Sequence, residues 1–94
     1  MATPPTLESP VRANDDVLFQ ELHGEGVLLN LKTGVYFGLD PVGRRVWQLL
    51  QEHDTLGAVL TALLNEYDVA ETECVADLLA LVTDMEQHGL VTLG

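Results

Sequence analysis

The sequence predicts a single α+β domain in which a three-stranded antiparallel sheet is followed by three helices. Before residue 40, three short apolar runs are separated by connections of only a few residues, too short for the crossovers that parallel strands need. After Asp40 the apolar residues recur at helical spacing instead. A chain of 94 residues is long enough for one small domain with one core.

The predicted strands cover residues 17–23, 27–31 and 35–39, with turns at "GEG" (24–26) and "LKTG" (31–34). Gly34 can adopt the positive φ that closes a short hairpin with a bulge. Residues 1–14 contain three of the four prolines and few apolar side chains. We therefore expect a flexible N-terminal tail over residues 1–14 and a domain over residues 15–94.

The helix boundaries are indicated by residues suited to helix ends. Asp40 is a good N-cap, with a proline at the first helical position after it, and Thr55 is expected to cap the second helix. A third helix is predicted over about residues 71–88, and Gly89 ends it. Gly43 lies inside the first helix, where a close approach to the sheet would explain it. The final "LVTL" is expected to add a short strand or to pack against the sheet.

The charge of the chain excludes several classes of partner. There are 15 acidic and 4 basic residues, a net charge of −11, and no Lys or Arg follows Arg45. Such a surface repels nucleic acid and anionic lipid and attracts cationic partners, although acidity can also serve solubility alone. The single cysteine and the absence of a signal sequence or a membrane-spanning run predict a cytoplasmic protein.

No pattern of residues predicts catalysis, a metal site or a cofactor. The histidines at 23, 53 and 88 are far apart in sequence, and no basic residue lies near Cys74 to activate its thiol. The glycines form neither of the common phosphate-binding motifs. By elimination, the chain is interpreted as a binding module and not as an enzyme.

Two features indicate where it would bind. The third helix has an expected core stripe that Cys74 and Leu81 widen on one side, with Asp77 and Asp84 just beyond. The stripe itself is formed by Val75, Leu78, Leu79, Val82 and Met85. The third strand, "VYFGL", carries none of the lysines, prolines or inward charges that protect an edge. An open edge beside such a helix favours the addition of an extended peptide as a further strand.

The runs "VLLNLKTGVYFGLDPVGRRVWQLL", "LLNEYDV" and "DLLALVTDMEQHGLV" resemble the PqqD-like family over about residues 17–91. The most specific parts of the resemblance are "LKTGVYFGLDPVG" and the closing "GLV". It departs from the family at "VAETE", where an Asp-Pro-type cap commonly starts the third helix.

The resemblance implies a winged-helix-like fold and the recognition of ribosomally made, post-translationally modified peptides. Members bind the leader of a precursor peptide as an extra strand between the third strand and the third helix, and deliver it to a peptidase or radical SAM enzyme. Carried over by position, and with Cys74 added from the helix pattern, the peptide-binding residues are Val35, Tyr36, Phe37, Gly38, Cys74, Asp77, Leu78, Leu81, Asp84 and Met85.

The resemblance leaves more than one pathway open. A lysine-bearing leader of a lasso peptide, processed by a separate peptidase, would suit the acidic surface. Pyrroloquinoline quinone biosynthesis is the second alternative. An alternative from a different functional class is a winged-helix nucleic-acid binder, but it would need a basic recognition face that the helical half lacks.

Overall fold

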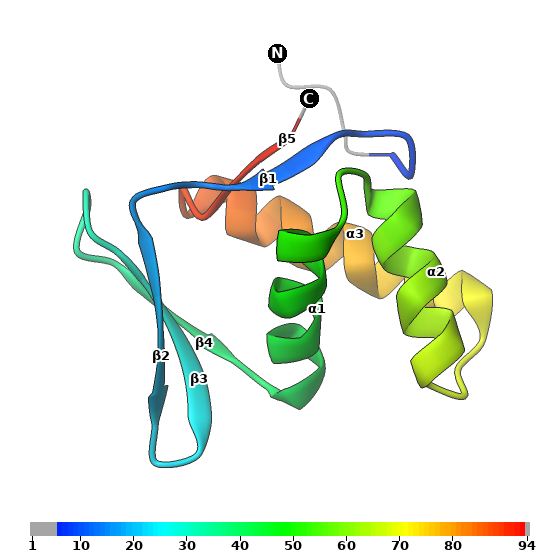
Figure 1. Ribbon diagram of the computed structural model, residues 1–94, viewed down its shortest axis with the longest axis horizontal. Coiled ribbons are helices and arrows are strands. Elements are labelled where there is room, and N and C mark those ends of the chain that lie inside the picture. The colour runs from blue at the N-terminus through cyan, green and yellow to red at the C-terminus, as the bar shows by residue number, and fades with distance from the viewer. Residues whose placement is uncertain (1–5, 94) are drawn as a thin grey trace.

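The computed structural model describes residues 6–93 and shows a three-stranded meander packed beside three helices (Figure 1). Strands β1 (Val11–Ala13), β2 (Val17–Leu22), β3 (Glu25–Asn30) and β4 (Tyr36–Leu39) are followed by α1 (Pro41–Glu52), α2 (Leu56–Glu66), α3 (Glu71–Gln87) and β5 (Val91–Leu93). The sheet order β2-β3-β4 is antiparallel throughout. The α+β class, the three-stranded antiparallel sheet and the three helices are confirmed. The winged-helix likeness stays a prediction.

The two hairpins of the meander turn differently. Leu22 pairs with Glu25, so the first turn contains only His23 and Gly24, with φ values of 55° and 83°. Two positive φ values are typical of the tight turns that match strand twist. The predicted turn at 24–26 therefore starts one position and ends two positions too late, because Glu25 begins β3. The second hairpin is as expected, with Gly34 at φ 75°.

Local capping explains why the helices begin and end where they do. The Asp40 carboxylate accepts a hydrogen bond from the Gly43 N–H at 2.7 Å, and Thr55 accepts one from the Ala58 N–H at 3.3 Å, so both predicted N-caps are confirmed. Helix α3 begins at Glu71 without a side-chain cap. It ends as predicted at Gly89, with φ 72°, where the Gly89 and Leu90 N–H groups return to the last turn as in a Schellman motif.

A second, two-stranded sheet joins the two ends of the described chain. β1 pairs antiparallel with β5, in the register Val11↔Leu93 to Ala13↔Val91. Val11 is only 5% exposed, and its N–H donates to the Asp54 carbonyl at 2.9 Å. Residues 11–13, which fall within the tail expected over 1–14, thus form a strand that was not among the predicted elements, with Val11 in the core. The expectation for residues 1–5 lies outside the described residues.

The core lies among the three helices, with contributions from the meander and from the β1–β5 pair. Leu28 of β3 is fully buried there, together with apolar residues from all three helices. Of the stripe predicted on α3, Leu78, Val82 and Met85 are buried, whereas Val75 and Leu79 are half-buried. Within residues 6–93, no helix is both long and apolar enough to cross a bilayer.

Candidate functional site

Strand β4 is an open edge of the meander. Within the described residues it pairs with β3 alone. The Asn30 N–H donates to the Val35 carbonyl at 2.9 Å, and bonded pairs alternate along an antiparallel ladder. Phe37, opposite Leu28, is therefore the next residue whose backbone groups face β3. The N–H and C=O groups of Tyr36 and Gly38 then face outwards, where a further strand could bond to them.

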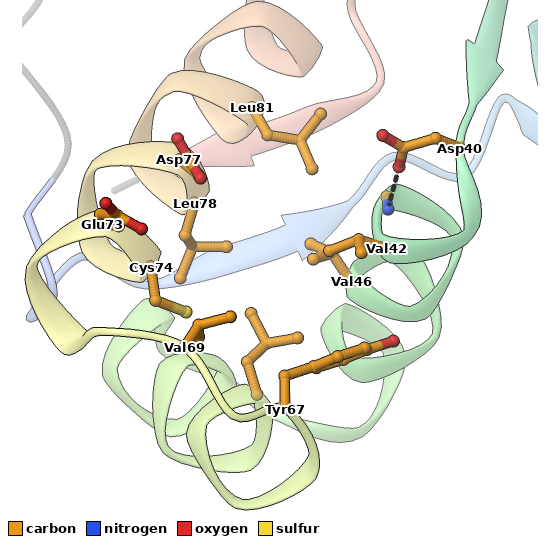
Figure 2. Close-up of a pocket in the computed structure, with 12 residues that line it drawn as sticks. Asp40, Val42, Val46, Tyr67, Val69, Glu73, Cys74, Asp77, Leu78 and Leu81 are labelled. Atoms are coloured by element: carbon orange, nitrogen blue, oxygen red, sulfur yellow. Dashed lines mark hydrogen bonds between the residues drawn. The ribbon is translucent and has the colours of Figure 1, made fainter.

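A cavity of about 380 Å³ begins where β4 ends and extends between α1 and α3 (Figure 2). We call it the α1–α3 cavity. Its lining residues are Asp40, Val42, Gly43, Val46, Leu63, Tyr67, Val69, Glu73, Cys74, Asp77, Leu78 and Leu81. Its volume is at the small end of the roughly 300–1,000 Å³ found for small-ligand sites. It therefore suits one or two apolar side chains better than a large cofactor.

The cavity is apolar inside and acidic at its margin. Val42 and Val69 are 48% and 47% exposed, so an apolar surface is accessible to a ligand there. Asp40, Glu73 and Asp77 contribute three carboxylates, and the ion pairs found in residues 6–93 involve none of them. An apolar interior with unpaired carboxylates around it favours an apolar side chain that has cationic neighbours.

Cys74 supplies the one thiol among the residues that line this cavity. Burial and, secondarily, the nearby Asp77 carboxylate raise the pKa of its thiol. A thiol with a raised pKa is a poor nucleophile at neutral pH, because little thiolate is present. Cys74 therefore acts here as a small apolar lining residue. Residues 6–93 contain no group of three or more His, Cys, Asp or Glu side chains able to hold a metal ion.

The structure brings four of the ten predicted site residues to the α1–α3 cavity. These four line the cavity from one side of α3 and are Cys74, Asp77, Leu78 and Leu81 (Figure 2). The remaining predicted residues are Val35, Tyr36, Phe37 and Gly38, on or next to the β4 edge, and Asp84 and Met85 on the last turns of α3.

Two of the predicted residues on α3 lie outside the cavity. Met85 is fully buried in the core, so it supports the helix from behind and does not line the cavity. Asp84 lies beyond the cavity and is exposed, with its carboxylate 3.5 Å from the Nδ1 of His88. His88 in turn packs edge-on against Phe37, with ring centroids 5.2 Å apart, so β4 and the end of α3 touch at this point.

Sequence reasoning did not find the wall of the cavity that α1 and the α2–α3 connection provide. Val42, Tyr67 and Val69 belong to it, and so does Asp40, which was recognised only as a helix cap. Gly43 was the available signal. A Cβ there would lie 3.1 Å from the Asp40 carboxylate and 3.4 Å from Leu39, so the unusual glycine allows the tight junction between β4 and α1.

The comparisons with known proteins agree with this geometry. The family described as coenzyme PQQ synthesis protein D (PqqD) matches residues 25–91, which is well over half of the chain. The chain belongs to the PqqD family. No curated protein matches it.

Two solved structures resemble this PqqD-family domain along most of their length. The first, described as TbiB1 in complex with the TbiA(β) leader peptide, has a TM-score of 0.77 and 35% sequence identity, and the match covers 85% of this chain and 93% of that one. The second, a lasso peptide synthetase B1 complexed with the leader peptide, has a TM-score of 0.72 and 27% sequence identity. The match covers 88% of this chain and 98% of that one.

Proposed function

We propose that this PqqD-family domain binds the leader segment of a ribosomally made precursor peptide, in lasso peptide biosynthesis, and presents it to a processing enzyme. The observation that carries the proposal is the open β4 edge next to a small apolar cavity with an acidic margin. Both similar structures support it, since each is a complex with a leader peptide.

The leader would bind as a fourth strand of the meander. The outward backbone groups of Tyr36 and Gly38 would supply its register, with each hydrogen bond contributing a net of about 0.5–1.5 kcal/mol. Backbone bonds carry little sequence information, so selectivity would come from a leader side chain that enters the α1–α3 cavity. Burying one large apolar side chain there would add about 1.5–3 kcal/mol.

The charge distribution favours a lysine-bearing leader. Three of the four basic side chains already form ion pairs: Lys32 with Asp16, Arg44 with Glu21 and Arg45 with Glu66. The acidic side chains outnumber these pairs widely, and three of them border the cavity. Leader lysines on either side of the apolar residue in the cavity could therefore form ion pairs with these three carboxylates, which take part in none of the ion pairs described.

The domain is proposed to act without chemistry of its own. The one thiol in the cavity has a raised pKa, and the other titratable side chains that line it are the phenol of Tyr67 and three carboxylates at its margin. Cleavage or modification of the precursor would then be the task of a separate enzyme, with a leader peptidase as our first choice. The family description makes a role in pyrroloquinoline quinone synthesis the second candidate.

A direct binding experiment tests the proposal. The neighbouring genes are searched for a short precursor, and the intact domain is titrated into its fluorescently labelled leader, with a shuffled peptide of the same composition as control. We expect saturable binding with a dissociation constant of about 1 μM or tighter, equivalent to about −8 kcal/mol, and no saturation with the shuffled peptide. Equal binding of the two peptides, or of neither, would overturn the proposal. A preference for the precursor of pyrroloquinoline quinone would favour the second candidate.

A further inference from the structure

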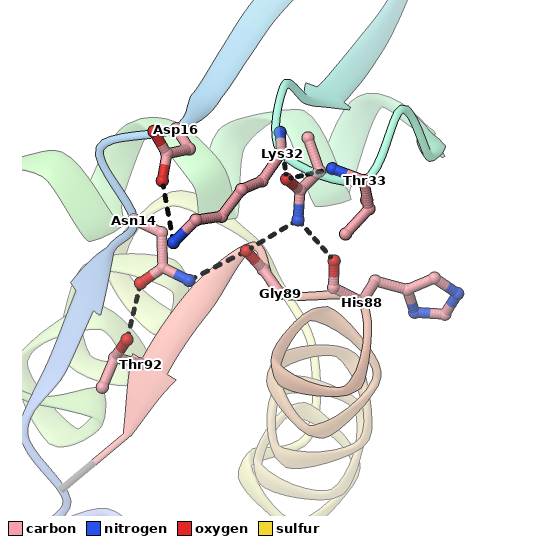
Figure 3. A network of polar contacts seen from close by, with 8 residues as sticks. Asn14, Asp16, Lys32, Thr33, His88, Gly89 and Thr92 are labelled. Carbon is pink, nitrogen blue, oxygen red and sulfur yellow. Dashed lines mark hydrogen bonds and ion pairs between the residues drawn. The ribbon is translucent and has the colours of Figure 1, made fainter.

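A buried amide at the end of β3 lies at the centre of a polar network (Figure 3). Asn30 is 4% exposed and is the one buried polar side chain among residues 6–93. Its Nδ2 donates to the carbonyls of His88 at 3.1 Å and Gly89 at 3.2 Å. Its Oδ1 accepts from the backbone N–H groups of Lys32 at 2.9 Å and Thr33 at 3.3 Å.

These bonds join the two elements between which a peptide would lie. Lys32 and Thr33 belong to the turn that leads directly into β4, whereas His88 and Gly89 end α3. The backbone of Asn30 holds the same turn, because its N–H donates to Val35 and its carbonyl accepts from Gly34. One side chain therefore fixes the start of β4 relative to the end of α3, close to the contact between Phe37 and His88.

The distance between β4 and α3 matters more for an added strand than for a ligand held on one side. A peptide strand must lie about 4.8 Å from β4 for its backbone bonds to form, while its side chains pack against the helix. If α3 moved away, the peptide could keep one set of contacts only by weakening the other. Most N–H···O bonds in proteins span about 2.7–3.2 Å, and a separation of about 3.6 Å no longer counts as one, so displacements of less than about 1 Å are enough to reduce affinity.

We propose that Asn30 is a positioning residue for peptide binding, which sets the spacing between β4 and α3 by tying the β3–β4 turn to the carbonyls that end α3. This inference rests on the proposed function. It assigns a role to a side chain that touches neither the β4 edge nor the α1–α3 cavity.

The chain contains a matched control for this side chain. Asn14 also uses its Nδ2 to donate to the Gly89 carbonyl, at 2.8 Å, but its Oδ1 accepts from the Thr92 hydroxyl. Asn14 thus joins the end of α3 to the β1–β5 pair and not to the turn before β4. Both amides stabilise the fold, whereas only Asn30 links the two elements that would hold the peptide.

The experiment compares Asn30→Asp with Asn14→Asp. Each substitution keeps the size of the side chain and replaces the donor to the Gly89 carbonyl with an oxygen. Leader affinity is measured at low temperature and scaled to the folded fraction obtained from circular dichroism. We expect Asn30→Asp to weaken leader binding at least tenfold and Asn14→Asp to weaken it less than twofold, although both lower the melting temperature. Equal affinities for the two variants would overturn the inference.

A second pair of variants and one measurement on the unmodified domain guard against a failure to fold. Asn30→Ser retains a hydroxyl that can accept from the turn amides but cannot reach α3, and Asn14→Ser is its control. In the unmodified domain, exchange of the Lys32 and Thr33 backbone amide hydrogens should slow when the leader binds. If the Asn30 hydrogen bonds favour leader binding, leader binding must favour these hydrogen bonds to the same extent. Hydrogen exchange at the backbone N–H of Asn14, which donates to the Leu90 carbonyl, should change little. Unchanged exchange at the turn would also contradict the inference.

These outcomes separate the inference from the proposed function. Failure of the unmodified domain to bind any leader would remove the proposed function itself. Normal binding by the unmodified domain together with normal binding by the Asn30 variants would remove only the positioning role.

Discussion

Replacing Leu81 with aspartate should abolish most of the leader affinity. Leu81 is half-buried on α3 and points into the α1–α3 cavity opposite Val42 and Val46 (Figure 2). Leu81→Asp removes the apolar contact and places a carboxylate where an apolar leader side chain would be buried. Loss of the contact costs about 1.5–3 kcal/mol, and desolvation of the new charge adds to it. Since 1.4 kcal/mol corresponds to tenfold, affinity should fall at least about tenfold.

The stability of the variant has to be measured separately. Leu81 also packs against the core, and an aspartate there would stand one turn from Asp77 and Asp84. Repulsion between like charges at these spacings costs about 0.2–0.5 kcal/mol per pair, so the melting temperature should fall modestly. The loss of affinity must therefore be assessed in the folded protein.

Leu79→Asp is the matched control. Leu79 is also half-buried on α3 and packs against the core, but it lies about 200° from Leu81 around the helix and does not line the cavity. Both affinities are measured by fluorescence polarisation below the melting transitions. We expect Leu79→Asp to bind the leader within twofold of the unmodified domain. Similar losses in the two variants, or no loss in either, would refute the assignment of the cavity to the leader.

Two further predictions concern the margin and the thiol of the cavity. Asp77→Asn should lower the affinity for a lysine-bearing leader up to about fivefold at low salt and less at high salt. Asp15→Asn, on the β1–β2 connection, should leave that affinity unchanged. Leader binding that is independent of salt would show that the acidity serves solubility alone. Cys74 should be alkylated by iodoacetamide more slowly than a free thiol near neutral pH, because its raised pKa leaves little thiolate, and bound leader should slow it further. Asp77→Asn should speed the alkylation, since Asp77 contributes to raising that pKa; a rate like that of a free thiol, unchanged by leader, would contradict this.

Much of the fold follows from residues whose effects are local. Asp40, Thr55 and Gly89 determine helix ends through bonds within one turn of the chain, and their positions were predicted correctly. The first hairpin was misplaced because His23 adopts a positive φ, which non-glycine residues seldom do. Strand β1 was missed for a different reason. Its pairing partner lies at the other end of the sequence, and three residues in a proline-containing stretch show no period of their own.

The site was predictable to the extent that it lies on one helix face. Cys74, Asp77, Leu78 and Leu81 line the cavity because helical spacing places them together, as the pattern indicated. Val42 comes from α1, and Tyr67 and Val69 come from the α2–α3 connection. Only the packing of α1 and α3 on α2 brings them to the cavity. Met85 fits the same helical pattern as Leu81 but faces the core, a distinction that depends on where the neighbouring elements lie.

The central claim is that the leader binds as a strand added to β4, and methylation of leader backbone amides tests it most directly. Every second N–H of an added strand points towards its neighbour, where Tyr36 and Gly38 offer their carbonyls. N-methylation removes one donor and adds bulk at one position at a time, and affinity is measured for each peptide. We predict losses of about tenfold or more at alternate positions, with the intervening positions within about twofold. Equal tolerance at all positions would contradict strand addition at β4.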